Sequence, residues 1–107
     1  STSGEDADAN LRRRAKLLQL IASKQRLGAV PAEMADFLRS VTDPDTFADL
    51  AASTLCDSPL LKQQLLETLD VGARLELFRR RLRAEVDALR LQRQLQGGLG
   101  DDRIETN

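Results

Sequence analysis

The longest regular pattern of hydrophobic positions in this chain runs from Asp70 to Gln96. Apolar side chains recur there every three or four residues, which places them on one face of an amphipathic helix. Asp70 is a typical N-cap residue, and Gly97-Gly98 is a typical stop because glycine adopts a left-handed conformation without steric penalty. The pattern predicts one helix over residues 71–96, about 40 Å long at roughly 1.5 Å per residue. Its expected core face consists of Val71, Leu75, Phe78, Leu82, Val86 and Leu89.

A second and weaker set of apolar positions lies almost opposite the first on the same helix. A helix that is buried on one side only has no need of this set. Isolated surface leucines are nevertheless common, and alanine is simply a good helix former. Two interpretations therefore stay open: ordinary surface, or a contact surface for a second copy of the chain or for a protein substrate. The positions, called the apolar seam below, are Leu77, Ala84, Ala88, Leu91 and Leu95.

Four shorter helices are predicted upstream of the long one. Prolines open three of them, because a proline at the first helical position loses no hydrogen bond and already has a helical φ. Two of these starts also place a capping Asp43 or Ser58 directly before the proline. Asp8 or Asn10 caps the first helix, and Gly28 ends it. The predicted ranges are 10–27, 31–40, 44–56 and 59–69.

These elements predict an all-α fold, a bundle of four short helices and one long C-terminal helix. Short connections make each helix turn back on its neighbour, which is the geometry of a compact bundle. The three phenylalanines, Phe37, Phe47 and Phe78, each lie on an expected inward face, so they are predicted to share one core. Leu11 and Leu69 are also expected to face inward.

The length of 107 residues fits a single domain. The polar, acidic residues 1–9 are expected to form a disordered tail. The helical bundle then occupies residues 10–96. The glycine-rich and acidic residues 97–107 are expected to form a flexible tail.

The composition argues against catalysis. The chain has no histidine, which removes the commonest general base and the commonest zinc ligand. Its one cysteine, Cys56, cannot form an internal disulfide and is expected to be a reduced, buried thiol. Ser23 with Lys24, or Ser58 with Lys62, has the residue types of a Ser-Lys dyad, but nothing nearby supplies an oxyanion hole. We therefore expect no catalytic, cofactor-binding or metal-binding residues.

The sequence has no features of a membrane or secreted protein. No run approaches the roughly 20 apolar residues that a membrane-spanning helix needs. The N-terminal stretch STSGEDADAN has no basic start followed by an apolar core, so it does not read as a signal peptide. Together with the unpaired cysteine, this predicts a cytoplasmic location.

Although the net charge is only −1, positive and negative residues are concentrated in different segments of the chain. Residues 10–27 carry +6, residues 28–70 carry −6 and residues 71–96 carry +4. In one interpretation these helices neutralise each other on the surface, where single ion pairs contribute about 0–1 kcal/mol. In the other, the basic helices 10–27 and 71–96 form a cationic face for nucleic acid or an acidic partner. The chain has no Tyr or Trp to stack on bases, which makes nucleic acid the less favoured partner.

Five segments of the chain, in this order and spacing, are similar to the helical second half of the Lon protease N-terminal domain. The resemblance covers roughly residues 11–95. Its most specific parts are the second and third segments. The five are Val30-Pro31-Ala32-Glu33, then Asp43-Pro44-Asp45-Thr46-Phe47-Ala48-Asp49-Leu50-Ala51-Ala52, then Lys62-Gln63-Gln64-Leu65-Leu66-Glu67-Thr68-Leu69-Asp70, then Arg74-Leu75-Glu76, and finally Glu85-Val86-Asp87-Ala88-Leu89.

This resemblance implies a substrate-recognition and assembly subdomain without catalytic function. In the family, a β-rich half that is absent here precedes such a bundle, and the domain recruits unfolded or damaged proteins for an ATPase and a Ser-Lys peptidase further along. The chain departs from the family pattern at Ala73, where members commonly have a capping glutamate, and at Gly97-Gly98, where the helix is expected to stop. The parent protein is then either a stand-alone Lon-domain protein or a divergent protease with a hinge at this point.

Overall fold

Five helices in sequence make up the part of the chain that the structure describes. The computed structural model describes the backbone of residues 3–106 and the side chains of residue 4 and residues 6–97. No strand occurs among these residues, so the prediction of an all-α fold with a long last helix is confirmed. The helices are α1 (Ser3–Arg26), α2 (Ala32–Ser40), α3 (Pro44–Leu55), α4 (Pro59–Glu67) and α5 (Val71–Thr106).

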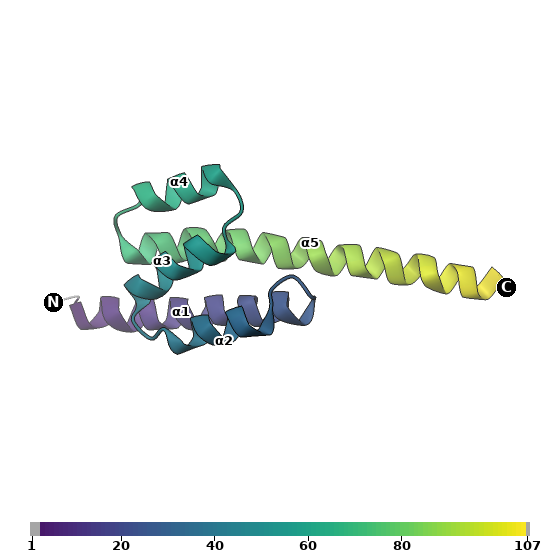
Figure 1. Ribbon diagram of the computed structural model, residues 1–107, viewed down its shortest axis with the longest axis horizontal. Helices are drawn as coiled ribbons and strands as arrows, with labels where there is room; N and C mark the ends of the chain where they lie inside the picture. The colour runs from purple at the N-terminus through teal and green to yellow at the C-terminus, as the bar shows by residue number, and fades with distance from the viewer. Residues whose placement is uncertain (1–2, 107) are drawn as a thin grey trace.

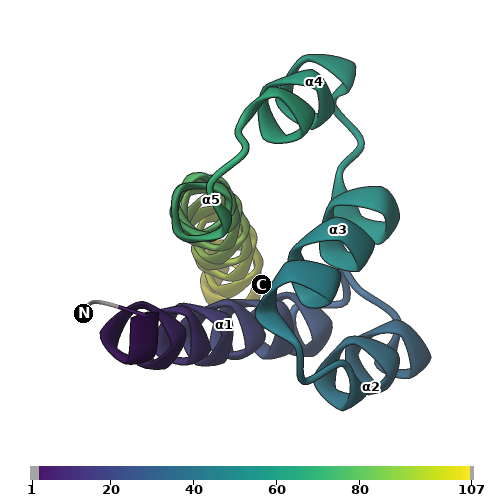
Figure 2. The ribbon, with the colours of Figure 1, turned by 90° about the vertical axis from the view of Figure 1, so that its left-hand side faces the viewer.

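Helices α1 and α5 run side by side in the same direction and share the largest helix–helix interface (Figure 1). The three short helices lie on one side of this pair, and α4 is the farthest of them from α1 (Figure 2). The second half of α5 extends well past the other helices (Figure 1). The molecule is therefore elongated, with principal extents of 65 × 25 × 25 Å.

The core is formed by side chains from all five helices. The predicted core face of α5 is confirmed for Leu75, Phe78, Leu82 and Val86, which are all buried, while Val71 is partly buried. The other helices bring their own buried side chains to the same cluster. These include Leu17, Leu20, Ile21, Ala35, Leu38, Phe47, Ala48, Ala51, Leu61 and Leu65.

The capping residues read from the sequence make the expected hydrogen bonds. The Asp43 carboxylate accepts from the Thr46 amide at 2.9 Å, and the Ser58 hydroxyl accepts from the Leu61 amide at 3.2 Å. These bonds satisfy amides of the first turn that have no partner within the helix. The bond from Thr46 also lowers the pKa of Asp43 below its ordinary value. The starts of α3 and α4 are thus fixed by the residues that predicted them.

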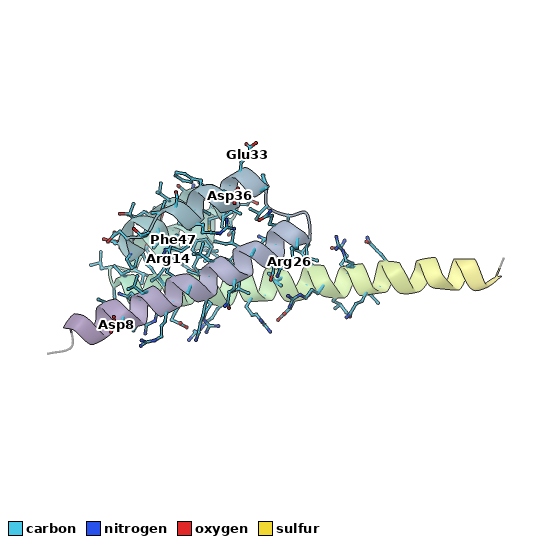
Figure 3. The ribbon with its side chains drawn as sticks, turned by 90° about the horizontal axis from the view of Figure 1, so that it is seen from below. Asp8, Arg14, Arg26, Glu33, Asp36 and Phe47 are labelled. Atoms are coloured by element: carbon cyan, nitrogen blue, oxygen red, sulfur yellow. The ribbon has the colours of Figure 1, made fainter. Side chains whose placement is uncertain are left out.

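Helix α2 is attached to α1 through Arg14. Its Nε donates to the carbonyl of Val41 at 2.8 Å, and its Nη2 donates to the carbonyl of Arg39 at 2.7 Å. The guanidinium also lies 5.4 Å from the centre of the Phe47 ring, and the two side chains are labelled side by side in Figure 3. One side chain of α1 therefore satisfies carbonyls at the C-terminal end of α2 and contacts α3.

Both outer helix ends were predicted wrongly. Helix α1 begins at Ser3, not after Asp8 or Asn10, and α5 continues through Gly97 to Thr106. The acidic residues near the start of α1 favour a helix because they interact well with the positive end of its dipole. Glycine lowers helix propensity by roughly 1 kcal/mol but stops a helix only where it adopts a left-handed conformation. Among the described residues only Gly28 does so, with φ of 80°, and it follows α1 as predicted. The outermost residues of the two expected tails, 1–2 and 107, lie outside the described residues.

Three expected inward side chains are instead exposed. Phe37 is 48% exposed, because α2 turns Ala35 and Leu38 toward the core and leaves Phe37 at the edge. Leu69 is 87% exposed because α4 ends at Glu67, two residues before it. Leu11 is also exposed, on the first half of α1. The prediction of one core with three phenylalanines therefore holds for Phe47 and Phe78 only.

Candidate functional site

The apolar seam is divided between the bundle and the projecting part of α5. Leu77 is partly buried and packs against the core. Ala84 and Ala88 are exposed, and Leu91 and Leu95 keep 56% and 61% of their surface exposed. The structure therefore leaves the last four of the five seam residues at the surface and removes Leu77 from that set. Their role as a contact surface stays a prediction.

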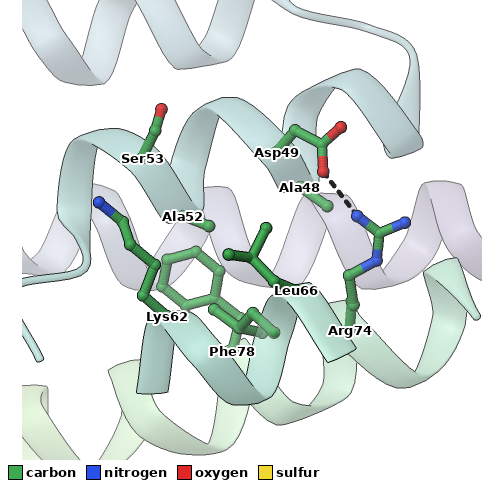
Figure 4. A pocket seen from close by; sticks show the side chains of 9 residues that line it. Ala48, Asp49, Ala52, Ser53, Lys62, Leu66, Arg74 and Phe78 are labelled. Atoms are coloured by element: carbon green, nitrogen blue, oxygen red, sulfur yellow. Dashed lines mark hydrogen bonds and ion pairs between the residues drawn. The ribbon is translucent and has the colours of Figure 1, made fainter. Parts of the chain in front are cut away.

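A second apolar surface lies between α3, α4 and α5, and we call it the α4 groove (Figure 4). It has a volume of about 240 Å³. The buried Phe78 ring of α5 and the small Ala48 and Ala52 of α3 lie on its inner side, and Leu65 and Leu66 of α4 line it on the other. Leu66 is 68% exposed. The groove exists because α4 stands apart from α5, with alanines on the facing side of α3.

Charged side chains are present at the edge of the α4 groove. Arg74 Nη1 donates to Asp49 at 2.5 Å, and its Nη2 donates to Asp45 at 3.2 Å. The Nε of Arg74 is buried and has no hydrogen-bond partner among the described residues. Lys62, which also lines the groove, makes no ion pair within the described part of the chain. The groove thus combines an apolar interior with donors at its rim.

A third surface is polar and lies between the two long helices. We call it the cationic cleft, and its volume is about 370 Å³. Helix α1 contributes Lys16, Gln19, Leu20 and Ser23, and α5 contributes Arg79, Arg83 and Arg90. The two basic segments read from the sequence therefore lie side by side and share one face.

Carboxylates neutralise only part of the positive charge on α1 and α5. On the side of the acidic helices, Arg74 pairs with Asp45 and Asp49 of α3, as the first interpretation of the charge pattern predicts. Between the two basic helices, Lys24 pairs with Glu85 at 2.7 Å. Beside the cleft, Glu76 accepts three hydrogen bonds from Arg79, which lower the pKa of Glu76 and raise that of Arg79.

The residues that could form a Ser-Lys dyad are engaged elsewhere. Lys24 donates to Glu85, so it is not available to Ser23. Ser58 caps α4, as described above.

Cys56 is only partly buried, not fully buried as expected. This partial burial raises the pKa of its thiol, which favours the unreactive protonated form at neutral pH.

The described residues contain neither a group of side chains that could hold a metal ion nor a helix that could span a membrane. No group of three or more His, Cys, Asp or Glu side chains in that part of the chain is arranged to hold a metal ion. In the same part, no helix has a stretch long and apolar enough to span a membrane.

Sequence reasoning found the apolar seam but not the α4 groove. The groove residues come from three helices, and only the packing of α4 brings them together. Leu66 was an available signal, because a leucine directly after the inward-facing position 65 points away from the core face of the helix. The cationic cleft was predicted only in part. The sequence shows that both helices are positively charged, but it does not show that they lie side by side.

Comparison with known proteins finds Lon proteases. The chain is 35% identical over 74 residues to a Lon protease of Desulfosudis oleivorans and 32% identical over 71 residues to one of Methylocella silvestris. A third, from Clostridium acetobutylicum, is 34% identical over 68 residues. These matches cover 69%, 66% and 64% of this chain but only 9% of each protease. No protein-family model matches the chain, and no solved structure matches it significantly.

Proposed function

Because the chain is related to one short segment of the Lon proteases, we propose that it is a non-catalytic module that binds unfolded or damaged protein. The observation that carries this proposal is the α4 groove, an apolar surface that no described part of the chain covers. A protease of this kind must select substrates by a feature that folded proteins hide. Exposed apolar side chains are such a feature, since folded proteins bury most of them.

The size of the α4 groove suits a single large side chain. An apolar cavity of about 150 Å³ is enough to bind benzene. A groove of about 240 Å³ therefore has room for an aromatic or long aliphatic side chain of an extended segment. The gain is about 25 cal/mol for each Å² of apolar surface removed from water. Leu66, which lines the groove, is 68% exposed, so its side chain is available to contact such a segment.

Filling the α4 groove tests this proposal. Ala52→Leu adds three carbons to a side chain that lines the groove and is expected to weaken binding of a reduced, carboxymethylated model protein about tenfold, or 1.4 kcal/mol. Ala73→Leu adds the same carbons at an exposed position of α5 outside the groove and should leave affinity within about twofold. Fluorescence anisotropy measures the binding, and circular dichroism verifies that both variants keep their helices. Equal affinity of Ala52→Leu and the unchanged protein would rule out the groove as the substrate site.

The apolar seam is a candidate for self-association or for additional substrate contact. Its exposed leucines, Leu91 and Leu95, lie in the second half of α5. The mixed charges of Arg80, Arg81 and Glu85 allow an antiparallel pairing with a second copy. The double variant Leu91→Glu/Leu95→Glu is expected to lower the mass measured by sedimentation at high protein concentration. It should also reduce capture of the unfolded model protein. If mass and capture both stay unchanged while helix content is intact, the seam is ordinary surface.

Two further parts of the proposal come from the relationship alone. The β-rich half of the family's domain is the proposed neighbour of this bundle, and an ATPase and a Ser-Lys peptidase are the proposed recipients of its substrates. The cytoplasmic location also remains a prediction.

The alternative function, nucleic-acid binding, is favoured by the adjacency of the two basic helices in the cationic cleft. Its signature is an affinity that falls steeply as salt is raised.

A further inference from the structure

The cationic cleft has an unusual arrangement around Ser23. This side chain is only 8% exposed, and its hydroxyl donates to the Gln19 carbonyl at 3.1 Å. The same oxygen accepts from Arg26 Nη2 at 3.1 Å and from Arg90 Nη2 at 3.4 Å. Figure 3 shows Arg26 near the end of α1, where α5 passes beside it. Two guanidinium groups from different helices therefore share one neutral acceptor.

The charges around this point do not balance. Within the described part of the chain, Arg79 pairs with Glu76, and Arg83 lies 3.5 Å from Asp87. Lys16, Arg26 and Arg90 make no ion pair with any described carboxylate. Like charges that converge in this way repel each other, and the repulsion is stronger beside a protein surface than in bulk water. An anion placed in the cleft would relieve it.

We propose that the cationic cleft binds an acidic stretch of the same protein substrate whose apolar segment the α4 groove accepts. This inference rests on the proposed function and adds a charge preference to it. Carboxylates suit the cleft because guanidinium groups bind them through two parallel hydrogen bonds. From Arg79 to Arg90 the helix rises about 16 Å, which matches roughly five residues of an extended peptide. The expected ligand is therefore a short run of Asp and Glu.

A protein ligand fits the cleft better than a nucleic acid does. Glu76 and Asp87 lie beside the arginines they pair with, so they would repel the continuous row of phosphates in a nucleic-acid backbone. A peptide, by contrast, can have carboxylates at some positions and neutral groups at others, so its negative charge can be confined to the surroundings of Lys16, Arg26 and Arg90. Base stacking in the cleft has no support either, since Phe47 and Phe78 are buried, the exposed Phe37 lies on α2 and does not line the cleft, and the chain has no Tyr or Trp.

Three labelled peptides of equal length test the proposal. One is apolar with a neutral Gly/Ser flank, one carries the same apolar segment with a five-residue Asp/Glu flank, and one has the acidic run with neutral flanks only. At low salt the acidic flank is expected to raise affinity about tenfold over the neutral flank. Lys16→Gln/Arg90→Gln should lose this gain. The control Arg12→Gln/Arg39→Gln, which removes the same charge from exposed positions that do not line the cleft, should keep it.

Each outcome separates the two proposals. If the neutral-flanked peptide binds but the acidic flank adds less than twofold, the charge preference is wrong and the proposed function stands. If the neutral-flanked peptide does not bind while the acidic run binds through Lys16 and Arg90, the cleft is supported and the α4 groove is not. If a single-stranded oligonucleotide of equal charge displaces the acidic peptide at a lower concentration than unlabelled acidic peptide does, the cleft is a nucleic-acid site and the inference is overturned.

Discussion

Replacing Phe78 with alanine is expected to destabilise the fold by about 3–5 kcal/mol, the usual cost of deleting a fully buried aromatic side chain. Phe78 is 2% exposed and belongs to the core cluster shared by all five helices. Its ring also forms the inner side of the α4 groove, so its loss leaves a cavity there. Urea titration followed by circular dichroism measures the change in the free energy of unfolding.

Phe37→Ala is the matched control for Phe78→Ala. It deletes the same side chain from a position that is 48% exposed, so its cost should stay below about 1 kcal/mol. The difference between the two variants isolates burial from residue type. A loss below about 1 kcal/mol for Phe78→Ala would mean that the inward face of α5 is assigned wrongly.

Arg14→Ala is expected to cost about 2–3 kcal/mol, the second largest effect. The variant removes two hydrogen bonds from a charged donor to carbonyls at the C-terminal end of α2, and such bonds contribute about 1.5–3 kcal/mol each when they are buried. Two such bonds would sum to about 3–6 kcal/mol, and the expected loss is smaller because one bond is exposed to solvent and the other is only partly buried. The contact of the guanidinium with the Phe47 ring is also lost.

Two companion variants separate the causes of this loss. Arg14→Lys keeps the charge and can donate to one carbonyl, so its stability should lie between those of Arg14→Ala and the unchanged protein. Arg12→Ala removes an exposed arginine of the same helix and should change stability by less than about 0.5 kcal/mol. Similar losses for Arg12→Ala and Arg14→Ala would point to helix propensity rather than to the contacts with α2. Thermal and urea unfolding both measure the difference.

Local signals predicted local features well. Asp43 and Ser58 predicted the starts of α3 and α4, because capping depends only on residues within three positions. The spacing of Leu75, Phe78 and Leu82 predicted the buried face of α5 for the same reason. The relation to the Lon proteases was likewise readable in short segments of the sequence.

The predictions that were wrong or missing concern features that depend on contacts between helices. Phe37 fits the helical spacing of α2, but the rotation of α2 against α1 decides that Ala35 and Leu38 face the core and that Phe37 stays at its edge. To predict the α4 groove, the relative positions of three helices must be known. To predict that Arg26 and Arg90 meet at Ser23, the relative positions of two helices must be known. Periodicity within one helix carries no information about such placement. The candidate sites were therefore much less predictable than the fold class.

Helix α5 runs without interruption from the α4 groove past the end of the bundle (Figure 1). Between Phe78 and Gly97 it measures about 28 Å at 1.5 Å per residue. A helix of this length resists bending, so it acts as a lever arm. A tilt of the bundle would therefore displace the far end of this arm by more than it displaces the groove. A ligand held in the groove would consequently lie at a set distance from, and in a set orientation to, any partner that binds the projecting half of α5.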